Sequence, residues 1–289
     1  MLLNRKSLLL KGILFIAAGV LLGACGSEKP KDETLTTVQD TVAIVETPTI
    51  SYTLPSPLQV ASIFKKSGLK YKAGVTNSLK DPSKYTTNLS KAINLGVYSA
   101  DLSYAVLNKQ NQEAMTYMKL SRQLADNLGM GTVFDEGNLS KRFEKNLGNE
   151  DSLAYIIAEL QMVTDMYLDE NEQQQITSIV FAGAWVESLH IGANVYEKKD
   201  KSMNTKLAEQ MTILSSIINA LKAEEKKDPS ISGLVSDLQT IKDIYDQLPS
   251  IKKVTPETED TETVLTLTDD EVNQLTTKIE ELREKFIKG

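Results

Sequence analysis

The sequence predicts an all-α protein, an antiparallel multi-helix bundle with an amphipathic helix docked at its C-terminal end. Apolar residues recur at helical spacing over most of the chain after residue 55. Runs rich in β-branched and aromatic residues are almost absent between these segments, and proline and glycine stand where helices are expected to start and stop. With 41% hydrophobic residues in 289, the chain can bury a sizeable core.

The first residues have the order of a secretion signal. Arg5, Lys6 and Lys11 precede an apolar run at 13–22, about half of the roughly 20 residues that a membrane-spanning helix needs. The following Leu22-Gly23-Ala24-Cys25 resembles the lipobox of bacterial lipoproteins, in which a branched and two small residues precede the modified cysteine. The resemblance implies that residues 1–24 are removed and that acylated Cys25 anchors the chain in a lipid bilayer. The alternative is a plain secreted protein.

Cysteine content and the next residues refine this prediction. Cys25 is the one cysteine in the chain, so its lipidation leaves the mature protein without a disulfide. Several acyl chains hold a protein to a bilayer lastingly, so membrane association needs nothing from the folded domain. Gly26 and Ser27 follow, and the lack of an aspartate there resembles outer-membrane sorting in Gram-negative bacteria. Whether the domain faces the periplasm or the cell surface stays open.

The mature chain is acidic and begins with a tether. The whole chain has a net charge of −7, and residues 1–24 contribute +3, so the mature part is at about −10. This charge argues against nucleic acid or an anionic lipid surface as partner. Residues 25–55 hold threonine, proline and charged residues with no helical periodicity, and we expect a tether that separates the domain from the bilayer.

Residues 56–248 form the predicted helical bundle. Ser56 caps a short helix with Pro57 at its first position, and this helix stops at Gly68. Glycines at 129 and 131 end a later helix, and Pro249 follows the last one. The expected helices span about 83–108, 110–128, 139–147 (a short piece), 149–168, 171–198, 202–226 and 229–248.

A faint internal repeat divides this bundle. Gly96-Val97-Tyr98, with Leu102 and Ala105, has the same spacing as Gly183-Ala184-Trp185, with Leu189 and Gly192. The repeat predicts two similar three-helix halves, and chance similarity between helical sequences is the alternative. Glycine inside a helix costs about 1 kcal/mol relative to alanine, so we expect close helix contact or ligand approach at these positions.

The C-terminal region contains a linker and a last helix. Residues 249–267 are acidic, rich in threonine and without an apolar stripe, and we expect a linker there. Thr268 and Glu271 form a capping box that opens a helix over 268–289. Its apolar residues recur at spacings of three and four, and docking onto the bundle is favoured over self-association because two heptads are too few for a stable isolated coiled coil.

Motifs for common chemistries are missing. The chain has one histidine, His190, and Glu187 with His190 has the Glu-x-x-His spacing of di-iron helical proteins, which need a second such motif. Structural zinc needs more cysteine or histidine ligands than the chain has. No Gly-x-Ser-x-Gly elbow marks a nucleophile, and Gly129-Met130-Gly131 is a helix stop rather than a phosphate loop. We therefore predict no catalytic residue, no metal and no cofactor.

Two very apolar helices each have a narrow polar stripe. Asn94, Asp101 and Asn108 form one stripe, and Glu187, His190 and Asn194 form the other. Helices this apolar are usually central. The stripes belong to a satisfied hydrogen-bond network between helices, or they line a cleft with aromatic walls. The candidate ligand-binding residues are Tyr98, Asp101, Tyr104, Trp185, Glu187, His190 and Asn194.

Two functional hypotheses follow. The first is a non-catalytic, membrane-tethered helical protein that binds a small molecule, a peptide or an envelope protein. The second is an envelope hydrolase or other enzyme that uses Glu187 or Asp101, with His190 as proton carrier. The overall pattern resembles an uncharacterised family of helical bacterial lipoproteins, a resemblance that implies an anchored helical domain and assigns no activity. A structure discriminates between these possibilities, because the stripe residues either converge on an open concave pocket or are buried in helix packing.

Overall fold

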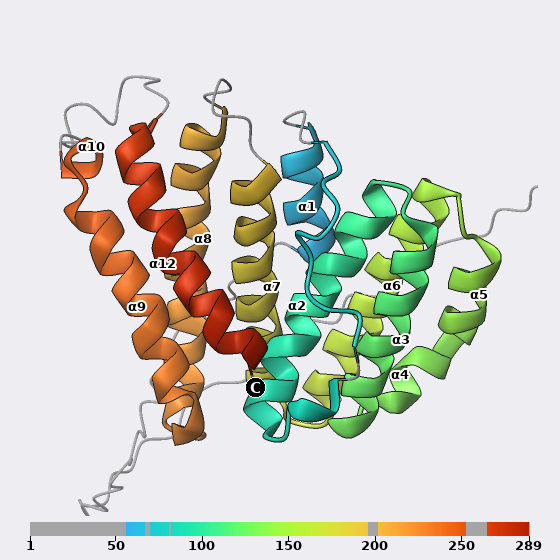
Figure 1. Cartoon of the computed structure of the whole chain (residues 1–289). Helices are drawn as coiled ribbons and strands as arrows, with labels where there is room; N and C mark the ends of the chain where they lie inside the picture. The colour runs from blue at the N-terminus through green and yellow to red at the C-terminus, as the bar shows by residue number, and fades with distance from the viewer. Residues whose placement is uncertain (1–55, 67–69, 81, 196–201, 253–264, 289) are drawn as a thin grey trace, which may run out of the picture. The chain divides into compact units, whose positions relative to one another are not determined.

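The computed structural model describes residues 56–66, 70–80, 82–195, 202–252 and 265–288. All regular structure in these ranges is helical, which confirms the predicted all-α bundle (Figure 1). Cys25, with the expected signal peptide 1–24 and tether 25–55, lies outside the described residues.

The elements follow one another with short connections. The first part of the bundle contains α1 (Pro57–Lys66), the 3₁₀ turn η1 (Pro82–Lys84), α2 (Asn88–Leu107), α3 (Asn111–Asn127), α4 (Gly131–Asp135), η2 (Glu136–Asn138), α5 (Leu139–Lys145) and α6 (Glu150–Glu170). The second part contains α7 (Gln174–Val195), α8 (Ser202–Glu225), η3 (Pro229–Ile231), α9 (Ser232–Gln247), α10 (Pro249–Lys252) and α12 (Asp269–Lys288).

Local capping explains where several helices begin. The backbone N–H of Gln59 donates to Ser56 Oγ at 3.1 Å, which confirms the cap of the first helix. The helix expected from residue 83 starts only at Asn88. Thr87 is extended (φ −87°, ψ 154°) and forms a reciprocal capping box with Ser90, so the preceding residues turn separately as η1.

Helices α2 and α7 cross at the centre of the bundle with their backbones in contact. A Cβ on Gly96 would lie 1.9 Å from the carbonyl oxygen of Val180, and one on Gly183 would lie 2.1 Å from that of Ile93. Each of these carbonyl residues lies three positions before the glycine of its own helix (Val180 before Gly183, Ile93 before Gly96), so the two helices meet in a locally two-fold manner. Close helix contact therefore explains both glycines.

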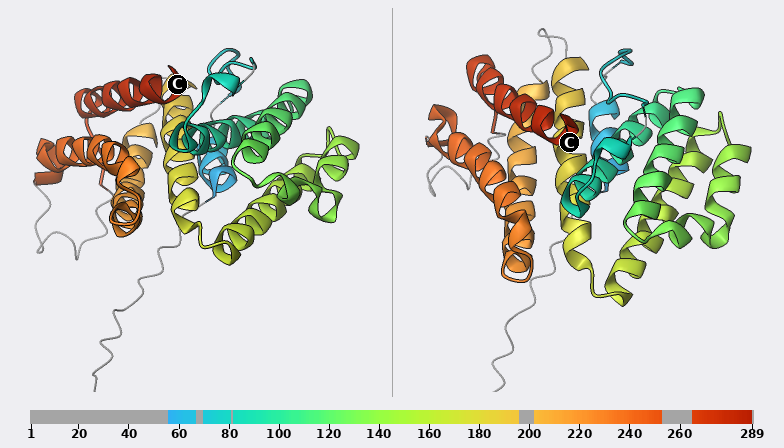
Figure 2. Two further views of the ribbon diagram at one scale, coloured as in Figure 1. Left: turned by 90° about the horizontal axis from the view of Figure 1, so that it is seen from below. Right: turned by 60° about the horizontal axis from the view of Figure 1, so that its bottom comes forward.

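The buried apolar side chains form two main clusters on either side of this crossing. One cluster is built mainly by α2–α6 and includes Phe143, and the other is built mainly by α7–α9 and α12 and includes Trp185. Figure 2 shows α7 (yellow) between α2–α6 on one side and α8, α9 and α12 on the other. The first cluster draws on five helices, and the similarity of two three-helix halves stays a prediction.

Helix α12 docks on the second half, as predicted. Leu275 and Ile279 are almost completely buried, in contact with α7, α8 and α9. The predicted capping box is present, with the Thr268 N–H donating to Glu271 Oε2 at 2.8 Å and the Glu271 N–H to Thr268 Oγ1 at 3.3 Å. This apolar face joins the core, whereas two isolated heptads would stay solvated.

The expected linker 249–267 is ordered at both of its described ends. Its first residues form α10, and Leu267 is buried at the other end. The Asn204 side chain donates to the Leu267 carbonyl at 2.8 Å, and the Leu267 N–H donates to the Asn204 carbonyl at 3.3 Å. These bonds tie the chain to α8 before α12 begins, and residues 253–264 lie outside the described ranges.

Helix α7 is the one helix among the described residues that is long and apolar enough to cross a membrane. Within the fold, 72% of its most apolar window is buried. The central helix of a globular bundle has the same length and composition, so burial by its neighbours accounts for its apolar sequence.

Candidate functional site

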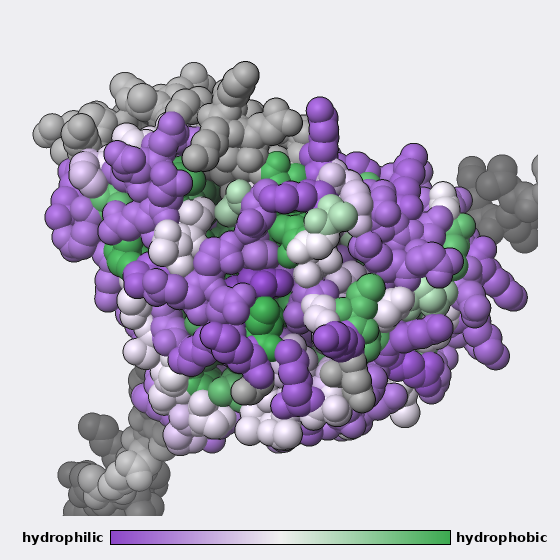
Figure 3. All heavy atoms as spheres, viewed as in Figure 1, coloured by the Kyte–Doolittle hydropathy of each residue, from purple (hydrophilic) through white to green (hydrophobic). Residues whose placement is uncertain are grey.

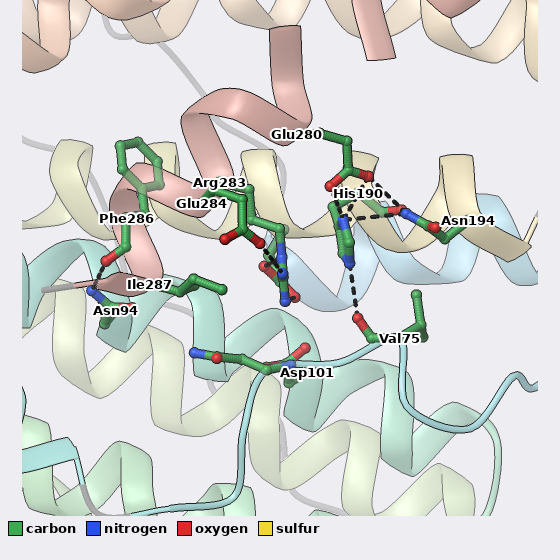
Figure 4. A network of polar contacts seen from close by, with 12 residues as sticks. Val75, Asn94, Asp101, His190, Asn194, Glu280, Arg283, Glu284, Phe286 and Ile287 are labelled. Atoms are coloured by element: carbon green, nitrogen blue, oxygen red, sulfur yellow. Dashed lines mark hydrogen bonds and ion pairs between the residues drawn. The ribbon is translucent and has the colours of Figure 1, made fainter. Parts of the chain in front are cut away.

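The two polar stripes lie on one side of the α2–α7 crossing and are covered by two other parts of the chain. Helix α12 covers Glu187 and His190, and a connecting segment at residues 70–80, here called the covering segment, lies over Asp101 and His190. Figure 4 shows this polar network, with Arg283 and Glu280 reaching from α12 toward α7.

Glu187 and Arg283 form a buried ion pair at the centre of the network. Arg283 donates from Nε to one carboxylate oxygen at 2.8 Å and from a terminal nitrogen to the other at 3.0 Å. The side chains are 0% and 7% exposed. The two parallel bonds match the planar guanidinium to the carboxylate, and together they offset the cost of removing both charges from water.

Asp101 adds a second acid beside this pair. Its Oδ2 accepts the backbone N–H of Asn77 at 3.1 Å. Burial, followed by repulsion from the Glu187 carboxylate, raises the pKa of Asp101 well above its usual value, although Arg283 opposes the rise. Its Oδ1 receives no hydrogen bond from the described residues, and in the acid form Asp101 can donate to Glu187. The cluster is then neutral, with one carboxylate and one guanidinium.

His190 links the covering segment to α12. Its Nε2 is 2.8 Å from the Val75 carbonyl oxygen, and its Nδ1 is 2.7 Å from both carboxylate oxygens of Glu280. Asn194 Nδ2 donates to Glu280 at 2.7 Å. The ring nitrogens therefore have partners on both sides.

Tyrosine hydroxyls hold the covering segment in place. Tyr98 donates to the Ser78 carbonyl at 3.3 Å, and Tyr117 donates to the Asn77 carbonyl at 2.7 Å. Tyr104 accepts the Lys72 N–H at 2.8 Å. Burial raises the pKa of both Tyr104 and Tyr117, so each hydroxyl keeps its proton at neutral pH.

The outer end of the covering segment is anchored by Tyr71. Its ring stacks on Tyr104 with centroids 5.8 Å apart, and its hydroxyl donates to Glu113 at 2.8 Å. Burial, with the adjacent Glu113 carboxylate, raises the pKa of Tyr71 to about 12. The segment is thus held along its length by aromatic and polar contacts.

The structure brings six of the seven candidate residues into or next to this network. Trp185 is the exception, because it points into the apolar core of the second half, where it is fully buried. Its indole N–H has no hydrogen-bond partner among the described residues. The six that meet the network are Tyr98, Asp101, Tyr104, Glu187, His190 and Asn194.

Sequence reasoning missed the partners on α12. Arg283 lies on the inner side of that helix beside Ile279 and Leu282. The sequence signal was an arginine next to the apolar stripe, and it did not reveal the partner. It lies 96 residues from Glu187. Glu280 lies 90 residues from His190 and had no such signal, because its side chain is partly exposed.

Hollow space near the network is small. A cavity of about 20 Å³ between α1, α2 and α7 has room for about one water, and the Ser188 hydroxyl at its wall has no partner among the described residues. An open depression of about 390 Å³ lies between α9 and α12, away from the stripes. In the described ranges, no three or more His, Cys, Asp or Glu side chains are grouped to hold a metal ion.

Comparison of the chain with protein-family models, with curated proteins and with solved structures gives no significant match.

Proposed function

We propose that this chain is a lipid-anchored envelope protein whose helical domain binds a partner and does not catalyse a reaction. The lipobox supports the anchor at Cys25, and the acidic mature chain disfavours nucleic acid as the partner. The residues after the cysteine favour the outer membrane of a Gram-negative bacterium, with the domain on the periplasmic or surface face.

One observation argues against catalysis at the stripes and so favours the non-catalytic hypothesis. The ionisable side chains of the two stripes bond to other parts of the same chain: Glu187 to Arg283, His190 to Glu280 and Val75, and Asp101 to Asn77. A general acid or base must reach a substrate atom at hydrogen-bond distance. Here those positions are taken by α12 and the covering segment, so the stripes hold the fold together.

A second candidate function has its own support. Asp101 is a buried acid whose pKa is raised by burial and by a neighbouring carboxylate, a combination that also occurs in catalytic pairs. An envelope hydrolase using Asp101, Glu187 and His190 would need α12 or the covering segment to move away. The binding hypothesis needs no such movement.

The anchor is tested by labelling cells with radioactive palmitate. The wild-type chain and the matched control Ser27→Ala should incorporate label, whereas Cys25→Ser should accumulate as unlabelled precursor. A labelled Cys25→Ser product of normal size would overturn the anchor. Gly26→Asp should keep its label but move to the inner-membrane fraction, and unchanged fractionation would overturn the outer-membrane proposal.

Catalysis is tested by complementation of a deletion strain with Asp101→Asn. This variant keeps the shape of the side chain and removes its transferable proton. The binding hypothesis predicts full complementation at wild-type abundance. Loss of complementation at wild-type abundance would favour the enzyme.

A further inference from the structure

Helix α6 presents an apolar line to solvent. Tyr155, Met162 and Met166 are 67%, 56% and 51% exposed, and they account for three of the four large hydrophobic side chains exposed in the described part of the chain. At 100° per residue the three lie within about 40° of one another, and they extend over roughly 17 Å of helix. An aligned apolar surface of this kind marks interaction sites more often than scattered single residues do.

The surroundings of this line are acidic. Between Glu150 and Glu170 the sequence contains six acidic residues and no lysine or arginine. Asp151 and Asp169 flank the line near its two ends, and Asp165 lies along one side of it. Arg142 from α5 pairs with Glu159, with two contacts of 2.8 Å on the other side. Glu150 is likewise paired, with Lys65 of α1. The exposed side of α6 is thus apolar along its middle, with the acids that lack an ion pair mainly on one side of it.

Asp165 has no hydrogen-bond or ion-pair partner in the described part of the structure. Its side chain reaches solvent, yet crowding by its neighbours removes part of its hydration, and this burial raises the pKa of Asp165 to about 6. A cation supplied from outside the chain would stabilise the ionised carboxylate.

Two other occupants fit less well. In a pair of α6 helices from two copies, the acidic residues around one line would face those of the other, and like charges brought together in this way disfavour association. An anionic lipid surface would meet the same repulsion. The face shown in Figure 3 is mostly hydrophilic, with small, separate apolar patches where it is coloured.

We propose that the exposed face of α6 is the docking surface for a basic amphipathic helix of a partner protein. The proposal rests on the binding function proposed above and names the surface and the chemistry of the partner. Methionine side chains adapt to varied apolar partners, and the acidic surround selects lysine or arginine at the edges of the incoming helix.

The test uses the full lipidated chain in phosphatidylcholine nanodiscs, with empty nanodiscs as blank. The probe is a fluorescent helical peptide of leucine and lysine, roughly 18 residues long, and its binding is followed by anisotropy. The comparison peptide has glutamate in place of lysine. The variants are Met162→Lys and Met166→Lys, and Leu79→Lys is the matched control because Leu79 is an exposed hydrophobic residue outside α6.

We expect the lysine peptide to bind the wild type and the glutamate peptide not to bind. Each α6 variant should bind about tenfold more weakly, because an apolar anchor is replaced by a like charge, and Leu79→Lys should stay within about twofold. Having two α6 variants guards against misfolding of either one, which circular dichroism would reveal. Equal binding by wild type and both variants, or binding of the glutamate peptide, would overturn the proposal.

Sedimentation of the same samples tests self-association. A dimer that Met162→Lys dissociates would show that the occupant is a second copy and would also overturn the proposal. Palmitate labelling of Met162→Lys separates this inference from the anchor. Retained label with unchanged peptide binding contradicts the docking surface alone, whereas a labelled Cys25→Ser chain contradicts the anchor alone.

Discussion

Replacing Asp101 and Glu187 by their amides, singly and together, tests the charge balance around Arg283. In Asp101→Asn the amide oxygen can accept the Asn77 N–H and the amide nitrogen can donate to Glu187, so the Glu187–Arg283 pair survives. In Glu187→Gln the guanidinium loses its carboxylate. Asp101 then ionises and replaces it, because Arg283 favours the charged form of Asp101.

The structure predicts how the three variants rank in their loss of free energy of unfolding. Asp101→Asn should raise the free energy of unfolding at pH 7, because the wild type must hold a proton on Asp101 there. Glu187→Gln should cost about 1–3 kcal/mol, since two charge-assisted bonds are exchanged for weaker ones. The double variant leaves the 7%-exposed Arg283 without an anion and should cost about 3–5 kcal/mol, or roughly 6–20 °C in Tm for a domain of this size. The double cost therefore exceeds the sum of the single costs.

The pH dependence of Asp101→Asn follows from the raised pKa of Asp101. The folded chain holds a proton on Asp101 that the unfolded chain releases above its ordinary pKa of 3.8. The contribution of Asp101 to the free energy of unfolding therefore falls as pH rises from about 4 to the folded pKa, by at most about 1.4 kcal/mol per pH unit. Asp101→Asn lacks this dependence. It should match the wild type near pH 4 and be more stable at pH 7.

The assay is urea unfolding of the four chains by circular dichroism at pH 4 and pH 7. Glu209→Gln is the control, because Glu209 forms an exposed pair with Lys206 on α8 and its loss should cost under about 0.5 kcal/mol. The reasoning fails if Asp101→Asn is as destabilising as Glu187→Gln at pH 7, since Asp101 would then be ionised in the fold. It also fails if the two single costs add to the double cost.

Three further predictions use other parts of the fold. Gly96→Ala should lower the free energy of unfolding by more than about 3 kcal/mol, because the added methyl group forces α2 away from the Val180 carbonyl. Gly233→Ala has open space around it and should raise the free energy of unfolding by about 0.5–1 kcal/mol. Equal effects of the two variants in thermal unfolding would contradict the backbone contact. Deleting residues 268–289 removes Arg283, the partner of Glu187. In the truncated chain Glu187→Gln should therefore stabilise the fold, whereas in the full chain it should destabilise it. If Glu187→Gln destabilises both chains, the pairing is contradicted. Elemental analysis of the purified chain should find no stoichiometric transition metal, and one tightly bound iron or zinc per chain would refute this.

Much of the fold could be predicted from the sequence because the signals are local. Helical periodicity, capping residues such as Thr268 with Glu271, and the αL turn at Gly129 act within one or two helical turns. The sequence also marked Gly96 and Gly183 as places where a side chain would be costly. Each signal depends on neighbours a few residues away, so the chain order alone reveals it.

The candidate site was predictable only in part. The sequence identified Asp101, Glu187 and His190 as polar groups on apolar helices, but it left open whether they lined a cleft or a network. That choice depends on what covers them, and the covering groups come from α12 and the covering segment. No local pattern relates Arg283 to Glu187, because their contact forms only after the helices between them have packed.

The sequence by itself thus determined the helices, their caps, the glycine positions and the expected lipid anchor. Only the tertiary structure decided that the polar stripes bind the chain's own C-terminal helix, and that one face of α6 stays apolar and acidic in solvent. The physical reason is that periodicity shows which face of a helix is apolar, whereas the partner of that face is set by long-range packing. On α6 the exposed Tyr155, Met162 and Met166 look like core residues in sequence, and only their exposure distinguishes them.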